Sequence, residues 1–421
     1  MQSQSTNLYN QLAKKKLIQK KINFDLVRIK NALKKLGNPE RKLTNPINII
    51  GSDGKYSVLT YLKYFIEANG MKTSAFISPS LKSIRERFWM GEHYLTFSEI
   101  KKTLKTIDKL NVQLTLFEAI TLIYIINAAS KNNDFNLIEA GALFAKDSTN
   151  VFEFPLSQII VNINKQHLNF LKKKTIDEVI KQKVGCLSNF TKIYINNQKP
   201  LILKKIKKIL KKNKSEKTFS NNWKIKKIKS DYYYLDRKNK ISLNLKNIRS
   251  KGLIENIGLA IKVALDIGIN KKIITKTVPK IQLEARVQFV KRGKLVKNLF
   301  KSEKVLLDGC HSEISGKNFA NYLKSLNLKK YGIIGMSENK NPEKFIKNFK
   351  GIFQKVIAVP IDNIDNSVKT NTLVEILKKN NFKNDTAKNI NQAIMKLSSK
   401  EKKVICIFGS LYLCGNFLEK N

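Results

Sequence analysis

Residues 46–70, PINIIGSDGKYSVLTYLKYFIEANG, decide the fold of this chain. The apolar start of the stretch predicts a buried strand, and residues 51–57 predict a tight loop. Apolar residues then recur at helical spacing over residues 58–66, and Gly70 can end this helix in a left-handed conformation. A strand that feeds a helix through a short loop is the building unit of parallel α/β sheets.

The loop itself predicts a phosphate site. Backbone N–H groups and the helix dipole would face the anion, Lys55 would neutralise it, and the Ser57 hydroxyl would reach a magnesium ion. The usual pattern has another glycine six residues before the lysine, where this chain has Ile49, so an ordinary strand–turn–helix remains the alternative. The residues predicted to bind the phosphates of a nucleoside triphosphate are Gly51, Ser52, Asp53, Gly54, Lys55, Tyr56 and Ser57.

Composition narrows the class of protein. The chain has 421 residues, enough for two or three domains, and 42% of them are apolar, enough for real cores. Its four cysteines show neither metal-ligand spacing nor a disulfide framework, which favours reduced thiols. The N-terminus lacks the apolar segment of a signal peptide, and the apolar run at residues 114–129 is too short to span a bilayer. We therefore expect a soluble, cytoplasmic protein that does not bind membranes.

The formal net charge of +48 favours phosphate-containing partners in general. Lysines are scattered over every segment, however, and they occur with an excess of Asn and Ile, which indicates a compositional bias. The densest patch lies at residues 204–229 and carries no RNA-binding motif, helix-turn-helix pattern or zinc-ligand spacing. We therefore expect no specific nucleic-acid partner.

Predicted strands and helices alternate along most of the chain. The alternation predicts a parallel, doubly wound sheet with ligands at the carboxyl ends of its strands. A less regular stretch at residues 277–295 contains Pro279 and Gly293 and resembles a connection between domains. The rhythm then restarts over about 120 residues, a normal domain size.

The expected fold class is thus α/β, with an N-terminal P-loop ATPase-like doubly wound domain and a smaller C-terminal Rossmann-like domain. The expected bounds are 1–283 for the first domain, 284–296 for a hinge and 297–421 for the second domain. Helices are predicted at 25–37, 58–70, 97–109, 114–129, 176–182, 256–267, 318–325, 342–349 and 370–379. Strands are predicted at 47–50, 73–77, 135–139, 158–163, 192–195, 232–235, 304–307, 330–335, 356–360 and 404–408.

Ten short motifs follow one another along nearly the whole chain. They are LGNP at 36–39, GSDGKYS at 51–57, SPSL at 78–81 with RER at 85–87, TLFE at 115–118, EAG at 139–141 leading to DSTN at 147–150, His167, KVG at 183–185, ARVQ at 285–288, DGCH at 308–311 and GSLYLCG at 409–415. In this order they resemble LGNP, GTNGKGS, SPHL…NER, TxFE, EVGLGGRLDATN, DH, KAG, ARLQ, DGAHNP and GSLYLAG of the folylpolyglutamate synthase/dihydrofolate synthase family. That family belongs to the Mur ligase superfamily.

The resemblance implies ATP-dependent amide ligation. A carboxylate of a pterin-bearing substrate attacks the γ-phosphate of ATP, which gives an acyl phosphate and ADP, and the amine of glutamate then displaces phosphate. The implied substrates are dihydropteroate or reduced folate, L-glutamate and ATP; Mg²⁺ is the implied cofactor, and a monomer is the implied state. Phosphoryl transfer depends on positioning and charge neutralisation, so cations and metal ligands should line the site.

The resemblance also assigns roles to single residues. Lys183 corresponds to a lysine that is carbamylated in the family, where the carbamate orients the acyl phosphate. Arg286 would reach the γ-phosphate from the hinge, and Asn256 would contact the base. The implied catalytic residues are Lys183, His167 and Arg286; the implied nucleotide-binding residues beyond the loop are Asn256, Arg286, Asp308 and His311; and the implied metal ligands are Ser57, Glu139 and His167.

Several positions depart from the motifs. Tyr56 replaces a glycine in the phosphate loop, Ser80 replaces the His of SPHL, Phe144 replaces a glycine of LGGR, and Gln166 replaces the aspartate before the motif His. Drift with function retained would explain this pattern, and so would decay toward a weakly active or inactive relative. Because the implied metal ligands and the main phosphate-binding cations are kept, retained activity is the favoured interpretation.

Three alternatives remain at this point. A Mur-type ligase acting on a nucleotide-linked peptide is disfavoured by the GSLYL segment at 409–413 and by the absence of a third, UDP-binding domain. A catalytically impaired homologue would bind ATP without ligation. A basic nucleic-acid-binding protein would bind any duplex tightly and with a steep dependence on salt.

Overall fold

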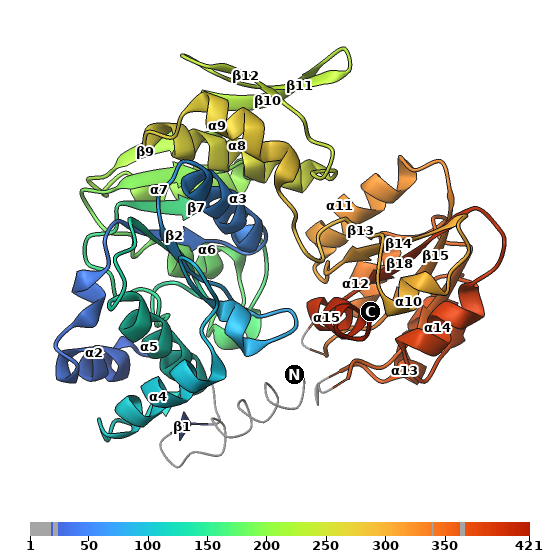
Figure 1. Ribbon diagram of the computed structural model, residues 1–421, viewed down its shortest axis with the longest axis horizontal. Coiled ribbons are helices and arrows are strands. Elements are labelled where there is room, and N and C mark those ends of the chain that lie inside the picture. The colour runs from blue at the N-terminus through green and yellow to red at the C-terminus, as the bar shows by residue number, and fades with distance from the viewer. Residues whose placement is uncertain (1–17, 20–23, 339, 363–366) are drawn as a thin grey trace. The chain divides into compact units, whose positions relative to one another are not determined.

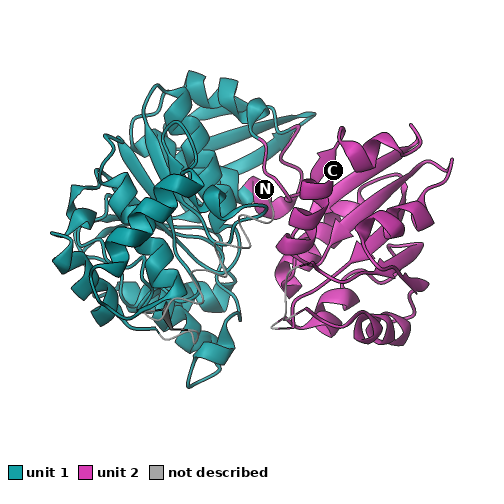
Figure 2. Cartoon of the chain, turned by 60° about the horizontal axis from the view of Figure 1, so that its bottom comes forward, with its two compact units in different colours: residues 1, 3–245, 255–281 teal, residues 2, 246–254, 282–421 magenta. Residues whose placement is uncertain are grey.

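The computed structural model describes residues 18–19, 24–338, 340–362 and 367–421 (Figure 1). The chain divides into two compact units, which Figure 2 colours separately. The first unit runs to Leu245 and includes Glu255–Ile281, and the second holds Lys246–Ile254 and Gln282–Asn421. We expected no signal peptide at the N-terminus, and residues 1–16, on which this expectation rests, lie outside the described residues. Within the described part, no helix is both long and apolar enough to cross a membrane.

The first unit is built on a seven-stranded sheet in the order β4-β3-β6-β2-β7-β8-β9. β4 pairs antiparallel with β3, and the other neighbours pair in parallel. The central strand β2 is buried along its whole length, which explains why its sequence lacks polar alternation. The strands are β2 (Pro46–Ile50), β3 (Thr73–Phe76), β4 (Phe88–Met90), β6 (Phe135–Glu139), β7 (Ser157–Ile160), β8 (Lys192–Ile195) and β9 (Glu216–Phe219). The short pair β1 (Ile18–Gln19) and β5 (Leu114–Thr115) lies apart from this sheet.

Helices pack against both faces of this sheet (Figure 1). One apolar cluster joins α2, α4 and α5 to β3, β4 and β6, and another joins α6 and α7 to β7 and β8. The helix α3 that follows the phosphate loop packs on β2, β3 and β6 and contacts α9. The helices are α2 (Leu26–Lys35), α3 (Lys55–Ala68), α4 (Phe97–Asp108), α5 (Leu116–Ala128), α6 (Ile176–Val184), α7 (Pro200–Leu210), α8 (Lys251–Asp266), which belongs to this unit from Glu255 on, and α9 (Lys271–Thr277). Single turns of 3-10 helix lie at Pro39–Lys42, Ile84–Arg87, Leu168–Phe170, Ser220–Asn222 and Val278–Lys280.

A three-stranded antiparallel sheet covers α8. It consists of β10 (Trp223–Ile228), β11 (Asp231–Asp236) and β12 (Lys240–Leu243). A Cβ at Gly258 of α8 would lie 3.2 Å from Ile225 and 3.3 Å from Trp223, so the helix and β10 approach closely. The dense lysine patch of the sequence therefore belongs partly to this sheet.

The second unit is a six-stranded sheet in the order β13-β14-β18-β15-β16-β17. β13 is antiparallel to β14, and the other pairs are parallel. Phe319, Phe345, Phe349 and Phe408 form the aromatic centre of its core. Its strands are β13 (Gln288–Val290), β14 (Glu303–Asp308), β15 (Lys329–Ile334), β16 (Lys355–Ala358), β17 (Asn384–Thr386) and β18 (Lys403–Phe408). Its helices are α10 (Lys294–Lys297), α11 (Glu313–Lys324), α12 (Pro342–Lys347), α13 (Thr370–Lys379), α14 (Ile390–Leu397) and α15 (Leu411–Lys420).

The structure confirms the expected α/β class and most of the predicted elements, with differences at their ends. The predicted helix at 114–129 begins two residues late, because Leu114–Thr115 pairs with β1 and the Thr115 hydroxyl caps α5 by accepting from Glu118 N. The strand predicted at 158–163 ends at Ile160, beyond which the chain runs along the phosphate loop. The helix predicted at 256–267 begins five residues earlier, at Lys251.

Other elements escaped prediction. α7 was masked by its lysines, although its buried residues Ile202, Ile206 and Leu210 recur four apart. The stretch at 277–295, expected to be irregular, contains β13, which forms the edge of the second sheet. The expected bounds 1–283, 284–296 and 297–421 stay a prediction, since the division into compact units follows different residues.

Candidate nucleotide-binding site

The phosphate loop ends in a glycine that the structure requires. Gly54 has φ +99° and stands directly before α3, and a Cβ on it would lie 2.6 Å from Asn256 Nδ2. Gly54 supplies no side chain to cap the helix, so the N–H groups of the first turn of α3 are not capped from this position. A helix N-terminus of this kind favours an anion through its N–H groups and its dipole.

Lys55 and Glu139 lie side by side in the structure. The Lys55 Nζ is 3.8 Å from Glu139 Oε1 and donates to Gly51 O at 3.4 Å. Glu139 ends β6, and its Oε2 accepts from Ser78 N at 3.0 Å. Both side chains are largely buried, so a cation and an anion are held together at the carboxyl edge of the sheet. This is where a parallel sheet normally binds its ligand.

The Ser57 side chain is positioned by a hydrogen bond from Asn256. The Ser57 hydroxyl donates to Gly54 O at 2.9 Å and accepts from Asn256 Nδ2 at 2.8 Å. Asn256 Oδ1 in turn accepts from Asn196 Nδ2 at 3.0 Å. A hydroxyl has two lone pairs, so the contact with Asn256 leaves Ser57 one for a metal ion. The side chain of Asn256 lies against Gly54 and Ser57, and its predicted contact with a base stays a prediction.

Lys183 is buried beside the same loop. Its Nζ donates to Gly51 O at 2.9 Å and to Ala142 O at 2.6 Å. Burial, and then the charge of Lys55, lower the pKa of Lys183 to about 7, while Asp147 and Asp53 act in the opposite direction. A large fraction of this amine is therefore neutral at neutral pH, which an ordinary surface lysine is not.

The connection after β7 lies along the phosphate loop. Asn162 O accepts from Ser52 N at 2.8 Å, and Gln166 Nε2 donates to Asp53 Oδ1 at 3.1 Å. His167 follows with φ +59°, and its ring stacks on Phe170 with centroids 6.1 Å apart. The segment that carries His167 is thus attached to the loop through Gln166.

The predicted metal ligands Ser57, Glu139 and His167 come from three separate parts of the first unit. Ser57 lies in the first turn of α3 beside Lys55, Glu139 ends β6 with its Oε1 3.8 Å from Lys55 Nζ, and His167 lies in the connection that follows β7. Among the described residues, no group of three or more His, Cys, Asp and Glu side chains is arranged to hold a metal ion. Magnesium is commonly bound through one or two protein ligands, several waters and substrate phosphates, and such a site needs no cage of this kind. The metal role of these residues stays a prediction.

In the second unit, the predicted residues Arg286, Asp308 and His311 form one group. Asp308 ends β14; its Oδ2 accepts from Val287 N at 2.9 Å, and burial raises its pKa while Arg286 opposes that rise. A Cβ on Gly309 would lie 2.9 Å from Arg286 Nη1, so the guanidinium lies against this glycine. His311 Nδ1 donates to Gly309 O at 2.9 Å, which places a proton on Nδ1.

The backbone of this group is unusual. Ala285 and Val287 have φ of +52° and +48°, a conformation that residues other than glycine rarely adopt and that is least favourable for a β-branched residue such as Val287. The Asp308 carboxylate holds Val287 N, and Ala285 O accepts from Gly309 N at 2.9 Å. Strained backbone held by surrounding groups is typical of functional segments.

Comparisons with known proteins agree with these features. The family profile "Dihydrofolate synthetase, C-terminal domain" matches residues 292–420. A dihydrofolate synthase/folylpolyglutamate synthase of Buchnera aphidicola subsp. Schizaphis graminum is 26% identical over 419 residues, which cover 95% of this chain and 93% of that protein. Residues 292–420 thus match the dihydrofolate synthetase C-terminal domain, and nearly the whole chain is similar to a dihydrofolate synthase/folylpolyglutamate synthase.

Two solved structures of family members share the fold over nearly the whole chain. E. coli FolC in complex with DHPP and ADP superposes with a TM-score of 0.86 at 18% identity, covering 98% of this chain and 96% of that one. A bifunctional folylpolyglutamate synthase/dihydrofolate synthase with Mn, AMPPNP and L-glutamate bound superposes with a TM-score of 0.81 at 16% identity. The match covers 95% of this chain and 94% of that one. At these identities the likeness shows the fold.

The structure explains one departure from the family motifs. Phe144, in place of a motif glycine, is fully buried and packs in the cluster with Ile50 and Ile160, so it adds to the core. Tyr56 is partly buried, and Ser80 is nearly buried. Gln166 takes part in the contact with Asp53.

Sequence reasoning missed several polar residues of the site. Asp147 is buried between Gly141 and Thr149; burial raises its pKa, and a Cβ on Gly141 would lie 2.3 Å from its Oδ2. Asn164 donates to Asp53 of the loop and Asn196 donates to Asn256, and both follow the ends of parallel strands. That position was the available signal, because the carboxyl ends of parallel strands share one edge.

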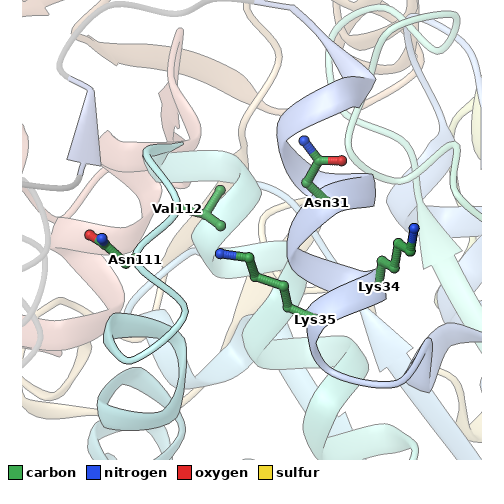
Figure 3. Close-up of a pocket in the computed structure, with 5 residues that line it drawn as sticks. All are labelled: Asn31, Lys34, Lys35, Asn111 and Val112. Carbon is green, nitrogen blue, oxygen red and sulfur yellow. The ribbon is translucent and has the colours of Figure 1, made fainter.

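A separate surface pocket lies beside α2. Lys35 Nζ donates to Leu110 O at 2.8 Å, and lysines in a last helical turn complement the negative end of the helix. None of the predicted site residues lines this pocket. Its lining residues are Asn31, Lys34, Lys35, Asn111 and Val112 (Figure 3).

Proposed function

We propose that this protein is an ATP-dependent ligase that joins L-glutamate to dihydropteroate, to reduced folates or to both. The observation that carries the proposal is the loop at α3, where Gly54 leaves the helix N-terminus without a side-chain cap and Lys55 lies beside Glu139. The relatives support the same chemistry, because their names describe folate–glutamate ligases and their structures hold ADP, AMPPNP and glutamate.

The residues of the loop fit the phosphates of ATP. Backbone N–H groups of Gly54 and the first turn of α3 would bind the β- and γ-phosphate oxygens, and Lys55 would neutralise their charge. The close approach of Gly51 to Val161 and of Gly54 to Asn256 leaves the loop no room for a Cβ at either glycine. Gly51, Ser52, Asp53, Gly54, Lys55, Tyr56 and Ser57 are proposed as the phosphate-binding residues.

Chemistry at this site would proceed in two steps. The substrate carboxylate oxygen attacks the γ-phosphorus, and the bond to ADP breaks. The amine of glutamate then attacks the acyl carbon, phosphate leaves, and the nitrogen loses a proton as the amide forms. The protein contributes positions and positive charge to both steps.

A divalent metal fits the donors near the loop. Ser57 retains a lone pair, Glu139 supplies a carboxylate, and His167 is proposed as the third ligand. When bound, Mg²⁺ would neutralise charge on the phosphates and align them. Glu139 also keeps Lys55 oriented toward the loop.

Lys183 is proposed to act as a carbamate. Its lowered pKa leaves a neutral amine, which can attack the carbon of CO₂ and then lose a proton. Arg286, Asp308 and His311 are proposed as nucleotide-binding residues of the second unit, and Asn256 is proposed as a nucleotide-binding residue of the first unit. A monomer in the cytoplasm, without a specific nucleic-acid partner, completes the proposal.

Release of ADP tests the proposal directly. Purified protein with MgATP and glutamate should release ADP when dihydropteroate or tetrahydrofolate is added in parallel assays. Lys55→Ala should abolish the release, because it removes the cation at the phosphates. ATP binding without any turnover would instead indicate the impaired homologue, and turnover equal to that of Lys55→Ala would reject the ligase.

A further inference from the structure

We infer that Asp53, Asn164 and Gln166 form a hydrogen-bonded clasp that positions the proposed ligase site. Within the clasp, Asp53 and Gln166 are a carboxylate and an amide whose places can be exchanged without loss of the bond between them. The inference rests on the proposed function for its site and adds positioning residues to it. The clasp joins the phosphate loop to the connection that carries His167.

The Asp53 carboxylate is held at both oxygens. Asn164 Nδ2 donates to its Oδ2 at 2.6 Å, and Gln166 Nε2 donates to its Oδ1 at 3.1 Å. Asn164 is 8% exposed, and Asp53 and Gln166 are partly buried. A carboxylate accepts and an amide N–H donates, so the polarity of the three groups matches.

Backbone contacts fix the same junction. Ser52 N donates to Asn162 O at 2.8 Å, Asn164 N donates to Ser52 Oγ at 3.1 Å, and Ser52 Oγ donates to Asn164 O at 3.2 Å. These contacts set the distance between the two segments. The side chain of Asp53 then decides how residues 164–166 are oriented.

A carboxylate in a phosphate loop has an electrostatic cost, since it repels the anion that the loop binds. Two amide donors reduce this cost by occupying its oxygens. The same bond with the same net charge would form if the loop carried the amide and the connection carried the carboxylate. The motifs quoted above have that reverse arrangement, with Asn in GTNGKGS and Asp before His, whereas this chain has Asp53 and Gln166.

The clasp ends one residue before a strained position. His167 adopts φ +59°, and Gln166 N donates to Asn164 O at 2.9 Å. Left-handed backbone at a residue other than glycine persists only when its surroundings hold it. Through Gln166, Asp53 therefore sets the backbone from which the imidazole of His167 extends. Asp53 and Gln166 are positioning residues, since they act through their neighbour.

An exchange of the two side chains tests this inference. Asp53→Asn and Gln166→Glu preserve shape, so the double variant keeps one carboxylate and one amide. Gln166→Glu alone places two carboxylates at hydrogen-bond distance and should lower kcat/KM about 10- to 100-fold and raise the Mg²⁺ requirement. Asp53→Asn alone should be milder, because the Gln166 amide can turn over to accept.

The double variant should recover to within about threefold of Asp53→Asn. Asn169→Asp adds the same charge at an exposed position of the same connection and should leave activity unchanged. Thermal unfolding of each variant without ligand checks that the fold is intact. A double variant as impaired as Gln166→Glu, or worse, would overturn the inference.

The wild type, Asp53→Asn, Gln166→Glu and the double variant are also compared in their affinity for MgAMPPNP by calorimetry. If the wild type shows no ligase turnover, the proposed function fails, and this binding cycle still tests the clasp. Recovery of affinity in the double variant supports it. Independent, additive losses of affinity reject it.

Discussion

Lys183 lies at a buried position where a positive charge on its amine is disfavoured. Its side chain is 1% exposed, it lies near Lys55, and its hydrogen bonds go to two backbone carbonyls. The fold therefore favours the neutral amine, and this preference must appear in the pH dependence of stability.

We expect the wild type to gain stability relative to Lys183→Met as pH rises from 7 to 9. In this window the unfolded chain keeps the proton on Lys183, whose ordinary pKa is 10.5, whereas the folded chain with a pKa of about 7 loses it. Folding therefore releases a proton, and the free energy of unfolding rises by up to about 1.4 kcal/mol per pH unit from this group.

Urea unfolding of both proteins at several pH values measures this difference. Lys212→Met, at an exposed lysine, is the matched control and should run parallel to the wild type. A constant difference between wild type and Lys183→Met across the window would contradict the lowered pKa.

At the scale of elements, β14 and β18 of the second unit begin with a buried ion pair. Lys403 Nζ lies 3.3 Å from Glu303 Oε1, and the two side chains are 2% and 0% exposed. Glu303 also accepts from Ser399 N at 2.9 Å and from Ser398 Oγ at 2.7 Å. The pair thus ties two neighbouring strands to the turn before β18.

Lys403→Met should destabilise the second unit by about 3–5 kcal/mol, because it leaves the Glu303 carboxylate buried without its cation. Adding Glu303→Leu should restore part of the loss, since it removes the orphaned charge. Lys329→Met, which breaks the exposed pair with Glu401, should have little effect. Chemical denaturation measures all three; equal effects of Lys403→Met and Lys329→Met would contradict the argument.

Elements were predictable where apolar residues alone set the pattern. β6 and α13 have the predicted bounds, because a buried strand and an amphipathic helix each show their period in the sequence. β13 was not predicted, because it is a three-residue edge strand that forms through its pairing with β14. α7 is amphipathic, but its lysines made the segment resemble a solvated tract.

The residues of the candidate site likewise fall into those that the sequence predicted and those that it did not. Lys55 and Ser57 could be predicted because they lie within one short segment around the start of α3. Asn164, Asn196 and Asp147 were not predicted, because each is more than 80 residues from the loop in sequence. Only the fold brings Asn164 to Asp53, Asn196 to Asn256 and Asp147 near Lys183.

At the scale of the molecule, the net charge of +48 means that like charges repel one another and destabilise the folded state. Raising NaCl from about 0.02 M to about 0.5 M should therefore raise Tm by about 2–5 °C, because the Debye length shortens from roughly 20 Å to roughly 4 Å. Differential scanning calorimetry measures the change, with sorbitol of equal osmolality as the uncharged control. A Tm that falls or stays constant would show that self-repulsion is not significant.

The sequence by itself determined the α/β class, the strands and helices with a clear apolar period, and the phosphate loop with its lysine and serine. These follow from local periodicity and from contacts within one turn. Only the tertiary structure decided that Glu139 lies at Lys55, that Asn256 lies under Ser57, and that Asp53 is held by two amides. Such pairings depend on which strands become neighbours, and burial is a property of the whole fold, so no local pattern encodes them.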